Sequence, residues 1–135
     1  MLSQRILFVD DDADWRLIVK GCLEDAGFEV IIAKDATQAM VETGGFKLDL
    51  IILDLDLGGE NGFVLMKFLK LNYPDVPFVL YTGLLHAEVA AQTMTCEGDQ
   101  PYLRKGAMQE LLEGVRDALS QEQTTPNHVL QSHAA

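Results

Sequence analysis

Six polar residues of this sequence stand immediately after short apolar runs: Asp10, Asp11, Asp12, Asp54, Thr82 and Lys105. If Asp10, Asp11 and Asp54 shared one depression, their carboxylates would repel one another unless a cation or a lysine offset the charge. Carboxylate oxygens suit hard cations such as Mg²⁺. An ammonium and a hydroxyl can bind phosphoryl oxygens, and a carboxylate can act as the nucleophile. These residue types favour phosphoryl capture over sugar hydrolysis or metal-dependent redox chemistry.

Apolar runs and helical patterns alternate along almost the whole chain. The runs predicted to be strands are 5–9, 28–33, 50–53, 78–81 and 102–104. Helical spacing predicts helices over 14–26, after the capping residue Asp35, after Gly62, over 85–95 and around Met108–Leu119. Such alternation implies a parallel sheet with helices on both faces. Ligands bind these sheets at the carboxyl ends of the strands, which is where the polar residues stand.

Apolar spacing also indicates which side of each helix faces the sheet. The expected inner residues of the first helix are Trp15, Ile18, Val19, Cys22, Leu23 and Ala26. Those of the third helix are Val64, Leu65, Phe68 and Leu69. Cys22 and Cys96 lack a CxxC or Cys/His pattern, so we expect packing roles for them. For Trp15 we expect packing, or a place on the rim of the acidic pocket.

The composition fits one soluble domain of 135 residues, with 48% hydrophobic residues. The net charge of −11 disfavours direct binding of nucleic acid through a basic surface. No apolar run reaches the roughly 18 residues of a membrane helix, and the N-terminus lacks a signal-peptide pattern, so we expect a cytoplasmic protein. We expect a domain over residues 4–120 and a mobile tail over 121–135, too short for an output domain.

Four segments at successive strand ends are similar to a known family. They are Phe8–Asp12, Ile52–Asp56, Tyr81–Gly83 and Tyr102–Lys105. Together they resemble the receiver domain of bacterial two-component response regulators, over about residues 4–120. The resemblance implies an α/β fold of the flavodoxin-like (βα)5 type, with a doubly wound parallel sheet in the order 2-1-3-4-5 and helices on both faces. It also implies a stand-alone signalling switch rather than an enzyme.

The resemblance implies that Asp54 is the phospho-acceptor and that Thr82 and Lys105 contact phosphoryl oxygens. Tyr102 would be the switch aromatic, which turns inward when Thr82 moves toward the phosphoryl group. A half-buried tyrosine that packs without switching fits the sequence equally well. The altered surface would be formed by the fourth helix, the fifth strand and the fifth helix, and phosphorylation would bias its two states.

Mg²⁺ is the cofactor that the resemblance implies, bound by Asp10, Asp11, Asp54 and the backbone carbonyl of Asp56. The phosphodonor would be a histidine kinase or a histidine phosphotransfer protein. A downstream protein target would bind the surface formed by the fourth helix, fifth strand and fifth helix. The sequence identifies none of these partners.

Several positions depart from the family pattern. Gly58 and Gly59 lie in a loop where most receivers have Pro, and Gly106 follows Lys105 where Pro is common. Asp56 and Leu84 stand two residues beyond the acceptor and the hydroxyl, where the family tunes the lifetime of the phosphoryl group. Because Leu84 could hinder an attacking water and Asp56 could orient it, the lifetime is left open.

Three alternatives apply to these motifs. Asp54-Leu55-Asp56 is similar to the nucleophile motif of haloacid-dehalogenase-type phosphatases, but that motif usually follows the first strand, and this chain has no room for a cap insertion. A receiver-like adaptor that works without phosphorylation usually lacks one of the reactive residues. Asp12 or Asp14 could simply cap a helix.

Overall fold

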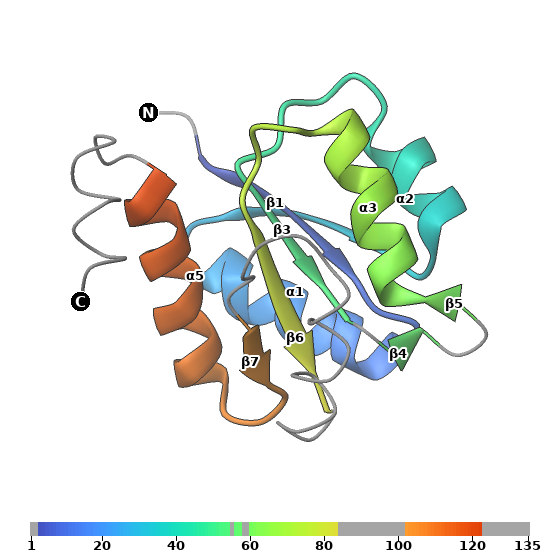
Figure 1. Ribbon diagram of the computed structural model, residues 1–135. Helices are drawn as coiled ribbons and strands as arrows, with labels where there is room; N and C mark the ends of the chain where they lie inside the picture. Colours follow the sequence, from blue (N-terminus) through green and yellow to red (C-terminus); the bar gives the residue numbers. More distant parts are fainter. Residues whose placement is uncertain (1–2, 55, 58–59, 84–101, 123–135) are drawn as a thin grey trace, which may run out of the picture.

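The computed structural model describes residues 3–54, 56–57, 60–83 and 102–122; for 56–57, 60–63, 102 and 121–122 it describes the backbone alone. Five parallel strands form the main sheet: β1 (Arg5–Val9), β2 (Glu29–Ala33), β3 (Leu50–Leu53), β6 (Phe78–Thr82) and β7 (Tyr102–Arg104). Their order is β2-β1-β3-β6-β7 (Figure 1). The predicted strand order 2-1-3-4-5 is therefore confirmed.

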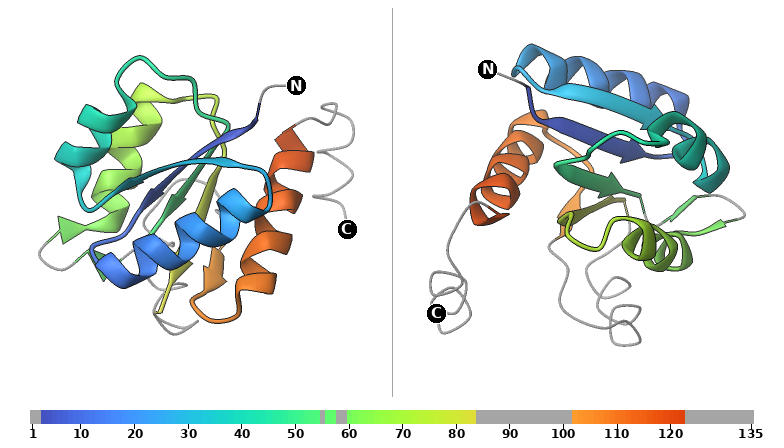
Figure 2. Two further views of the ribbon diagram at one scale, coloured as in Figure 1. Left: turned by 180° about the vertical axis from the view of Figure 1, so that it is seen from behind. Right: turned by 90° about the horizontal axis from the view of Figure 1, so that it is seen from above.

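Helices cover both faces of the sheet, as predicted (Figure 2). Their bounds are α1 (Ala13–Asp25), α2 (Ala36–Thr43), α3 (Gly62–Asn72) and α5 (Met108–Glu122). α1 and α5 lie on one face, while α2 and α3 lie on the other. The helix expected over 85–95, and Cys96 with it, lie outside the described residues. α5 extends two residues past the expected boundary at 120.

Strands β1, β2, β3 and β6 each supply side chains to two cores, one on each face, because successive residues of a strand point to opposite sides. In β1, Leu7 and Val9 pack in the core under α2 and α3, while Ile6 and Phe8 pack in the core under α1 and α5. Every residue of β3 is fully buried. Continuous apolar runs such as this one are typical of parallel strands covered on both faces.

Acidic side chains begin two of the helices. The Asp12 carboxylate accepts the backbone N–H groups of Asp14 and Trp15, so it caps α1. Asp35 caps α2 by accepting the N–H of Gln38. These bonds satisfy N–H groups that have no partner inside the helix. The capping role expected for Asp12 is confirmed.

Removing the α1 cap should lower the free energy of unfolding. For Asp12→Ala we expect a loss of about 1 kcal/mol, because the N–H groups of Asp14 and Trp15 lose their acceptor. Asp12→Asn removes the same charge but keeps an acceptor oxygen, so it should stay close to the wild type. Urea denaturation measures both, and equal losses in the two variants would show that the charge matters rather than the cap.

Some of the expected inner faces are wrong. Ile18 of α1 and Val64 and Phe68 of α3 are exposed, whereas Met66 is buried together with Leu65 and Leu69. α3 carries apolar residues on nearly all sides, so the spacing leaves several stripes possible and tertiary packing selects one. The short antiparallel pair β4 (Asp56–Leu57) and β5 (Glu60–Asn61) was not expected either.

No helix in the described part of the chain combines the length and the apolar character that a membrane crossing requires.

Candidate functional site

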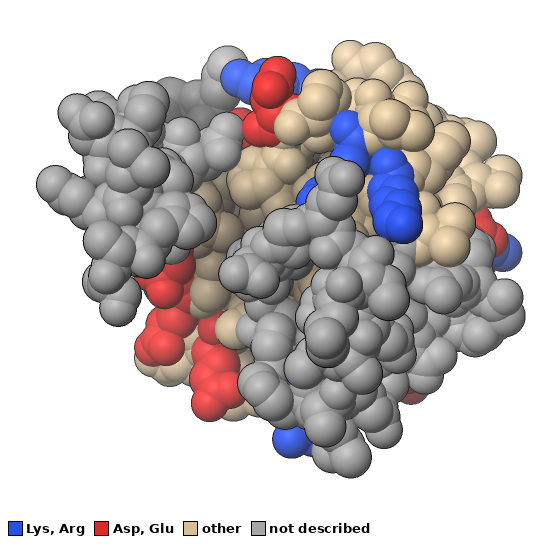
Figure 3. Space-filling view, viewed as in Figure 1, with Lys and Arg blue, Asp and Glu red and all other residues tan. Residues whose placement is uncertain are grey.

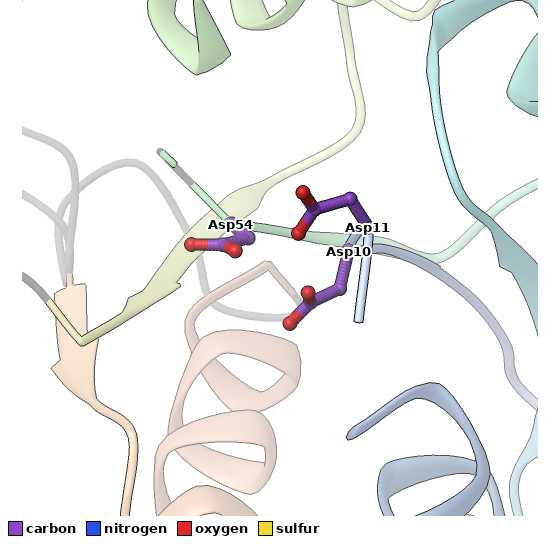
Figure 4. Close-up of side chains that lie close together, drawn as sticks. All are labelled: Asp10, Asp11 and Asp54. Carbon is purple, nitrogen blue, oxygen red and sulfur yellow. The ribbon is translucent and has the colours of Figure 1, made fainter. Parts of the chain in front are cut away.

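Three carboxylates gather beyond the ends of two neighbouring central strands. Asp10 and Asp11 follow β1, and Asp54 follows β3 (Figure 4). Because β1 and β3 are parallel partners, their carboxyl ends meet at one edge of the sheet. One carboxylate oxygen from each of the three residues lies within 4.8 Å of the others. The structure therefore brings together three of the residues that the sequence predicted for the site.

Backbone bonds hold the acidic residues in place. The N–H of Asp54 donates to the Val9 carbonyl at 2.9 Å, and the N–H of Asp10 donates to the Ala33 carbonyl at 3.0 Å. The Asp10 carbonyl accepts a hydrogen bond from Nη1 of Arg16 at 2.8 Å. The two bonds between strands extend the sheet ladders by one residue, so the acidic cluster is attached to the rigid centre of the fold.

Burial distinguishes the three carboxylates. Asp10 is fully buried, Asp54 is 2% exposed, and Asp11 is exposed. Oδ1 of Asp10 accepts the N–H of Asp12 at 2.9 Å. A buried carboxylate needs a charge partner or several hydrogen bonds to stay ionised. For Asp10 and Asp54, that partner comes from the loop after the last strand of the sheet.

Lys105 supplies the positive charge of the site. It follows β7, and its Nζ lies 2.6 Å from Oδ2 of Asp10 and 3.3 Å from Oδ2 of Asp54. Oδ2 of Asp10 has no directional hydrogen bond within the described residues, so the ammonium is what compensates its charge. Burial alone would lower the pKa of Lys105, but the contact with Asp10 and the charges of Asp54 and Asp10 raise it overall. The lysine is therefore charged at neutral pH.

Two aromatic residues lie beside the lysine. Trp15 packs against the core and lies next to the acidic cluster, as expected, but a contact with the lysine was predicted for neither residue. The Lys105 Nζ is 5.3 Å from the centre of the Trp15 ring. Trp15 packs edge-on against Tyr81, with ring centroids 5.7 Å apart and an interplanar angle of 85°. The Tyr81 hydroxyl accepts the N–H of Gly106 at 3.4 Å. The only sequence signal was proximity, since Trp15 follows the acidic run and Tyr81 precedes Thr82.

The structure describes the remaining predicted site residues only in part. Thr82 ends β6, the neighbour of β3, and is fully buried. The backbone of Asp56 lies in β4, and that of Tyr102 pairs with Leu80 in the main sheet. The side chains of Asp56 and Tyr102, and the whole of Leu84, lie outside the described residues. The switch role of Tyr102 stays a prediction.

The donor set fits a divalent cation. All the side-chain ligands are carboxylate oxygens, which hard cations such as Mg²⁺ prefer. With every group ionised, the three carboxylates and the Lys105 ammonium together carry a formal charge of −2. A divalent cation would neutralise that charge, and the exposed Asp11 leaves one side of the cluster accessible.

Comparisons with known proteins agree on one family. The family model described as response regulator receiver domain matches residues 6–116. The nitrogen assimilation regulatory protein NtrX of Azorhizobium caulinodans is 36% identical over 91 residues, which are 66% of this chain and 20% of that protein. The DNA-binding response regulator MtrA of Mycobacterium tuberculosis is 30% identical over 129 residues, which are 96% of this chain and 56% of that protein.

Solved structures give the same result. A CheY-like response regulator receiver domain protein from Methanospirillum hungatei superposes with a TM-score of 0.78 at 26% identity, covering 90% of this chain and 97% of that one. NtrX from Brucella abortus superposes with a TM-score of 0.79 at 29% identity, covering 90% of this chain and 28% of that one. The chain thus spans a minor part of NtrX and little more than half of MtrA.

Proposed function

This chain belongs to the response regulator receiver domain family, and on that premise we propose that it is a signalling switch that accepts a phosphoryl group on Asp54. The observation that carries the proposal is the position of the Asp54 carboxylate. It lies at the carboxyl edge of the sheet, 3.3 Å from the Lys105 ammonium and in one cluster with Asp10 and Asp11. A nucleophile, a cation site and a phosphate-binding charge are thus within reach of one another.

The proposed reaction is an in-line transfer to a carboxylate. An Asp54 oxygen forms the new P–O bond while the bond from phosphorus to the donor's leaving group breaks. With a phosphohistidine donor the P–N bond breaks, and the imidazole nitrogen keeps the bonding electron pair. The Lys105 ammonium, already beside Asp54, is placed to pair with a phosphoryl oxygen once it is there. The raised pKa of Lys105 keeps this charge available.

We propose that Asp10, Asp11 and Asp54, with the backbone carbonyl of Asp56, hold Mg²⁺. The bound cation would supply neutralisation of the charge on the phosphoryl oxygens. The sheet holds Asp10 and Asp54 close together although their carboxylates repel each other. A cation bound between them would relieve that repulsion. Lys105 offsets part of that repulsion in the absence of the cation.

The proposed output is a change of the surface formed by the helix expected over 85–95, by β7 and by α5. Thr82 and Lys105 are linked directly, since the N–H of Lys105 donates to the Thr82 carbonyl at 2.8 Å. A movement of either residue toward a phosphoryl group would therefore displace the loop between β7 and α5. The switching role of Tyr102 and the domain boundaries at residues 4–120 belong to this proposal.

The proposed partners are proteins rather than nucleic acid. A histidine kinase or histidine phosphotransfer protein would donate the phosphoryl group, and a protein target would read the altered surface. MtrA is named as DNA-binding, but this chain spans little more than half of its length. Here α5 presents the acidic residues Glu110, Glu113 and Asp117 to solvent, and red atoms gather over it in Figure 3. Such a surface repels a phosphate backbone.

Acetyl phosphate with Mg²⁺ tests the proposal. We expect the intact mass to rise by one phosphoryl group, and the gain to disappear when EDTA removes the cation. Steady release of phosphate from a phosphomonoester, with no lasting gain of mass, would instead indicate a phosphatase. A folded protein that neither gains mass nor binds beryllofluoride would indicate an adaptor that works without phosphorylation.

A further inference from the structure

A chain of contacts joins Lys105 to two aromatic residues that have no part in the proposed transfer. The Lys105 ammonium lies over the Trp15 ring, Trp15 packs edge-on against Tyr81, and the Tyr81 hydroxyl binds the N–H of Gly106. The contacts thus connect the side chain of Lys105 to the backbone of the next residue, Gly106. We call these contacts the aromatic support, formed by Trp15 and Tyr81.

We propose that Trp15 and Tyr81 are positioning residues that hold the Lys105 ammonium between Asp10 and Asp54. The proposal rests on the function proposed above, because it assigns the support to the residue that would pair with the phosphoryl group. Neither aromatic side chain is required to touch that group.

The last two residues of β6 bind the peptide groups that precede and follow the Cα atom of Lys105. The N–H of Lys105 donates to the carbonyl of Thr82, and the next N–H, that of Gly106, donates to the hydroxyl of Tyr81. Two adjacent residues of one strand therefore fix two consecutive peptide groups of the loop. Glycine restrains the backbone least of all residues, so the second bond matters at Gly106. Without it, the peptide that follows the lysine would lose its anchor to the sheet.

Trp15 restrains the other end of the lysine. A lysine side chain has four flexible carbons and loses conformational freedom when its ammonium is held in one place. An ammonium 5.3 Å from the centre of an indole ring is attracted to the ring face. This attraction favours the conformation that also reaches Asp10, at 2.6 Å. The ring is held by its edge-on packing against Tyr81, and the backbone of Trp15 is held by the bond from its N–H to the Asp12 cap.

Tyr81 can hold the loop in a fixed position because its own ring is fixed in the core. It is 1% exposed and packs among the core residues under α1 and α5. Its ring also contacts Phe8, with centroids 6.3 Å apart. A buried hydroxyl needs a hydrogen-bond partner, and the loop N–H of Gly106 supplies one. The arrangement couples the rigid core to the loop that carries the lysine.

The direct test is the NMR signal of the Lys105 ammonium in ¹⁵N-lysine-labelled protein, assigned by its loss in Lys105→Met. In the wild type, the indole ring should shift this signal upfield, and the ion pairs should slow its exchange with water. Trp15→Leu is expected to remove the upfield shift. Tyr81→Phe keeps the ring and removes only the hydroxyl, and it is expected to speed the exchange of the ammonium hydrogens. Circular dichroism establishes that each variant is folded.

The second readout is the rate of phosphorylation by acetyl phosphate. Tyr81→Phe should slow it by roughly 3- to 10-fold, the effect of one hydrogen bond. If Tyr81 acts through Lys105, the same substitution in a Lys105→Met background should produce no further loss. An equal loss in both backgrounds would overturn the proposal, because Tyr81 would then act independently of the lysine.

Two matched controls lie near the amino ends of the strands, away from the acidic cluster. Tyr73→Phe removes a hydroxyl that donates to the Thr43 carbonyl at 3.2 Å, and Phe46→Leu removes a ring that lies 4.8 Å from the Arg5 guanidinium. Neither should alter the Lys105 signal or the phosphorylation rate. An unchanged signal in both Trp15→Leu and Tyr81→Phe would refute the positioning role even if the wild type is phosphorylated. A wild type that is never phosphorylated, with the signal changed in both variants, would refute the proposed function and leave the positioning role supported.

Discussion

Replacing Asp54 by asparagine is expected to abolish the gain of a phosphoryl group from acetyl phosphate. The amide has nearly the same shape as the carboxylate but lacks the charged oxygen that attacks phosphorus. Fold and stability should be retained, because Lys105 keeps its partner at Asp10 and one of three mutually repelling carboxylates is removed. Intact mass after incubation with Mg²⁺ and acetyl phosphate measures the result.

The matched control for this substitution is Asp75→Asn. It removes the same charge from an exposed position between α3 and β6 and should leave the gain of mass unchanged. A phosphoryl group that persists in Asp54→Asn would contradict the assignment. Mapping of that group to Asp10 or Asp11 would then show that another carboxylate of the cluster is the acceptor.

Replacing Lys105 by alanine is expected to have the largest effect on stability. The substitution leaves the fully buried Asp10 carboxylate without its charge partner. Breaking a buried ion pair from one side typically costs several kcal/mol, and for a lysine that is partly exposed we expect about 2–4 kcal/mol in EDTA. Mg²⁺ should recover part of the loss, because a cation bound by the three carboxylates compensates the same charge. Urea denaturation in EDTA measures the loss of stability, and urea denaturation in Mg²⁺ measures the recovery.

The same variant separates phosphorylation from switching. We expect Lys105→Ala to accept some phosphoryl group, since Asp54 and the proposed cation ligands remain, but to lose the phosphorylation-dependent change in affinity for a partner. Lys67→Ala, on the exposed side of α3, is the control and should behave as the wild type in both assays. A normal change in partner affinity in Lys105→Ala would show that the lysine is not needed for the switch.

The fold could be predicted because its physical signals are local. Parallel strands that are covered on both faces are continuous apolar runs, and Leu50–Leu53 is such a run with every residue buried. Polar residues that follow such runs fall at one edge of the sheet, which is why the sequence alone was enough to assign Asp10, Asp11 and Asp54 to one cluster. The strand order came from the family resemblance.

The errors have a different origin. α3 is apolar around most of its surface, so spacing could not show that Met66 would be buried and Val64 and Phe68 exposed. The contacts of Trp15 with Lys105 and Tyr81 join residues far apart in the sequence, and nothing in the local pattern of either residue indicates the other. The sequence thus anticipated that the three carboxylates cluster and that Trp15 packs or lies at their rim, but not the contacts of the aromatic residues with the lysine and with each other.

The position of each reactive group in the sheet has a consequence for hydrogen exchange. Asp54 extends β3, which pairs with β1 on one side and β6 on the other, whereas Lys105 follows β7, the three-residue strand at the edge of the described sheet. Amide hydrogens of β3 should exchange only through opening of the whole domain, and those of β7 through fraying of one edge. Asp54 is therefore attached to a strand that we expect to open only with the whole domain, whereas Lys105 follows a strand that we expect to open locally, when its bonds to Thr82 and Tyr81 break. If so, local opening of the edge would release Lys105 from Asp10 and Asp54 without unfolding the strand that carries Asp54.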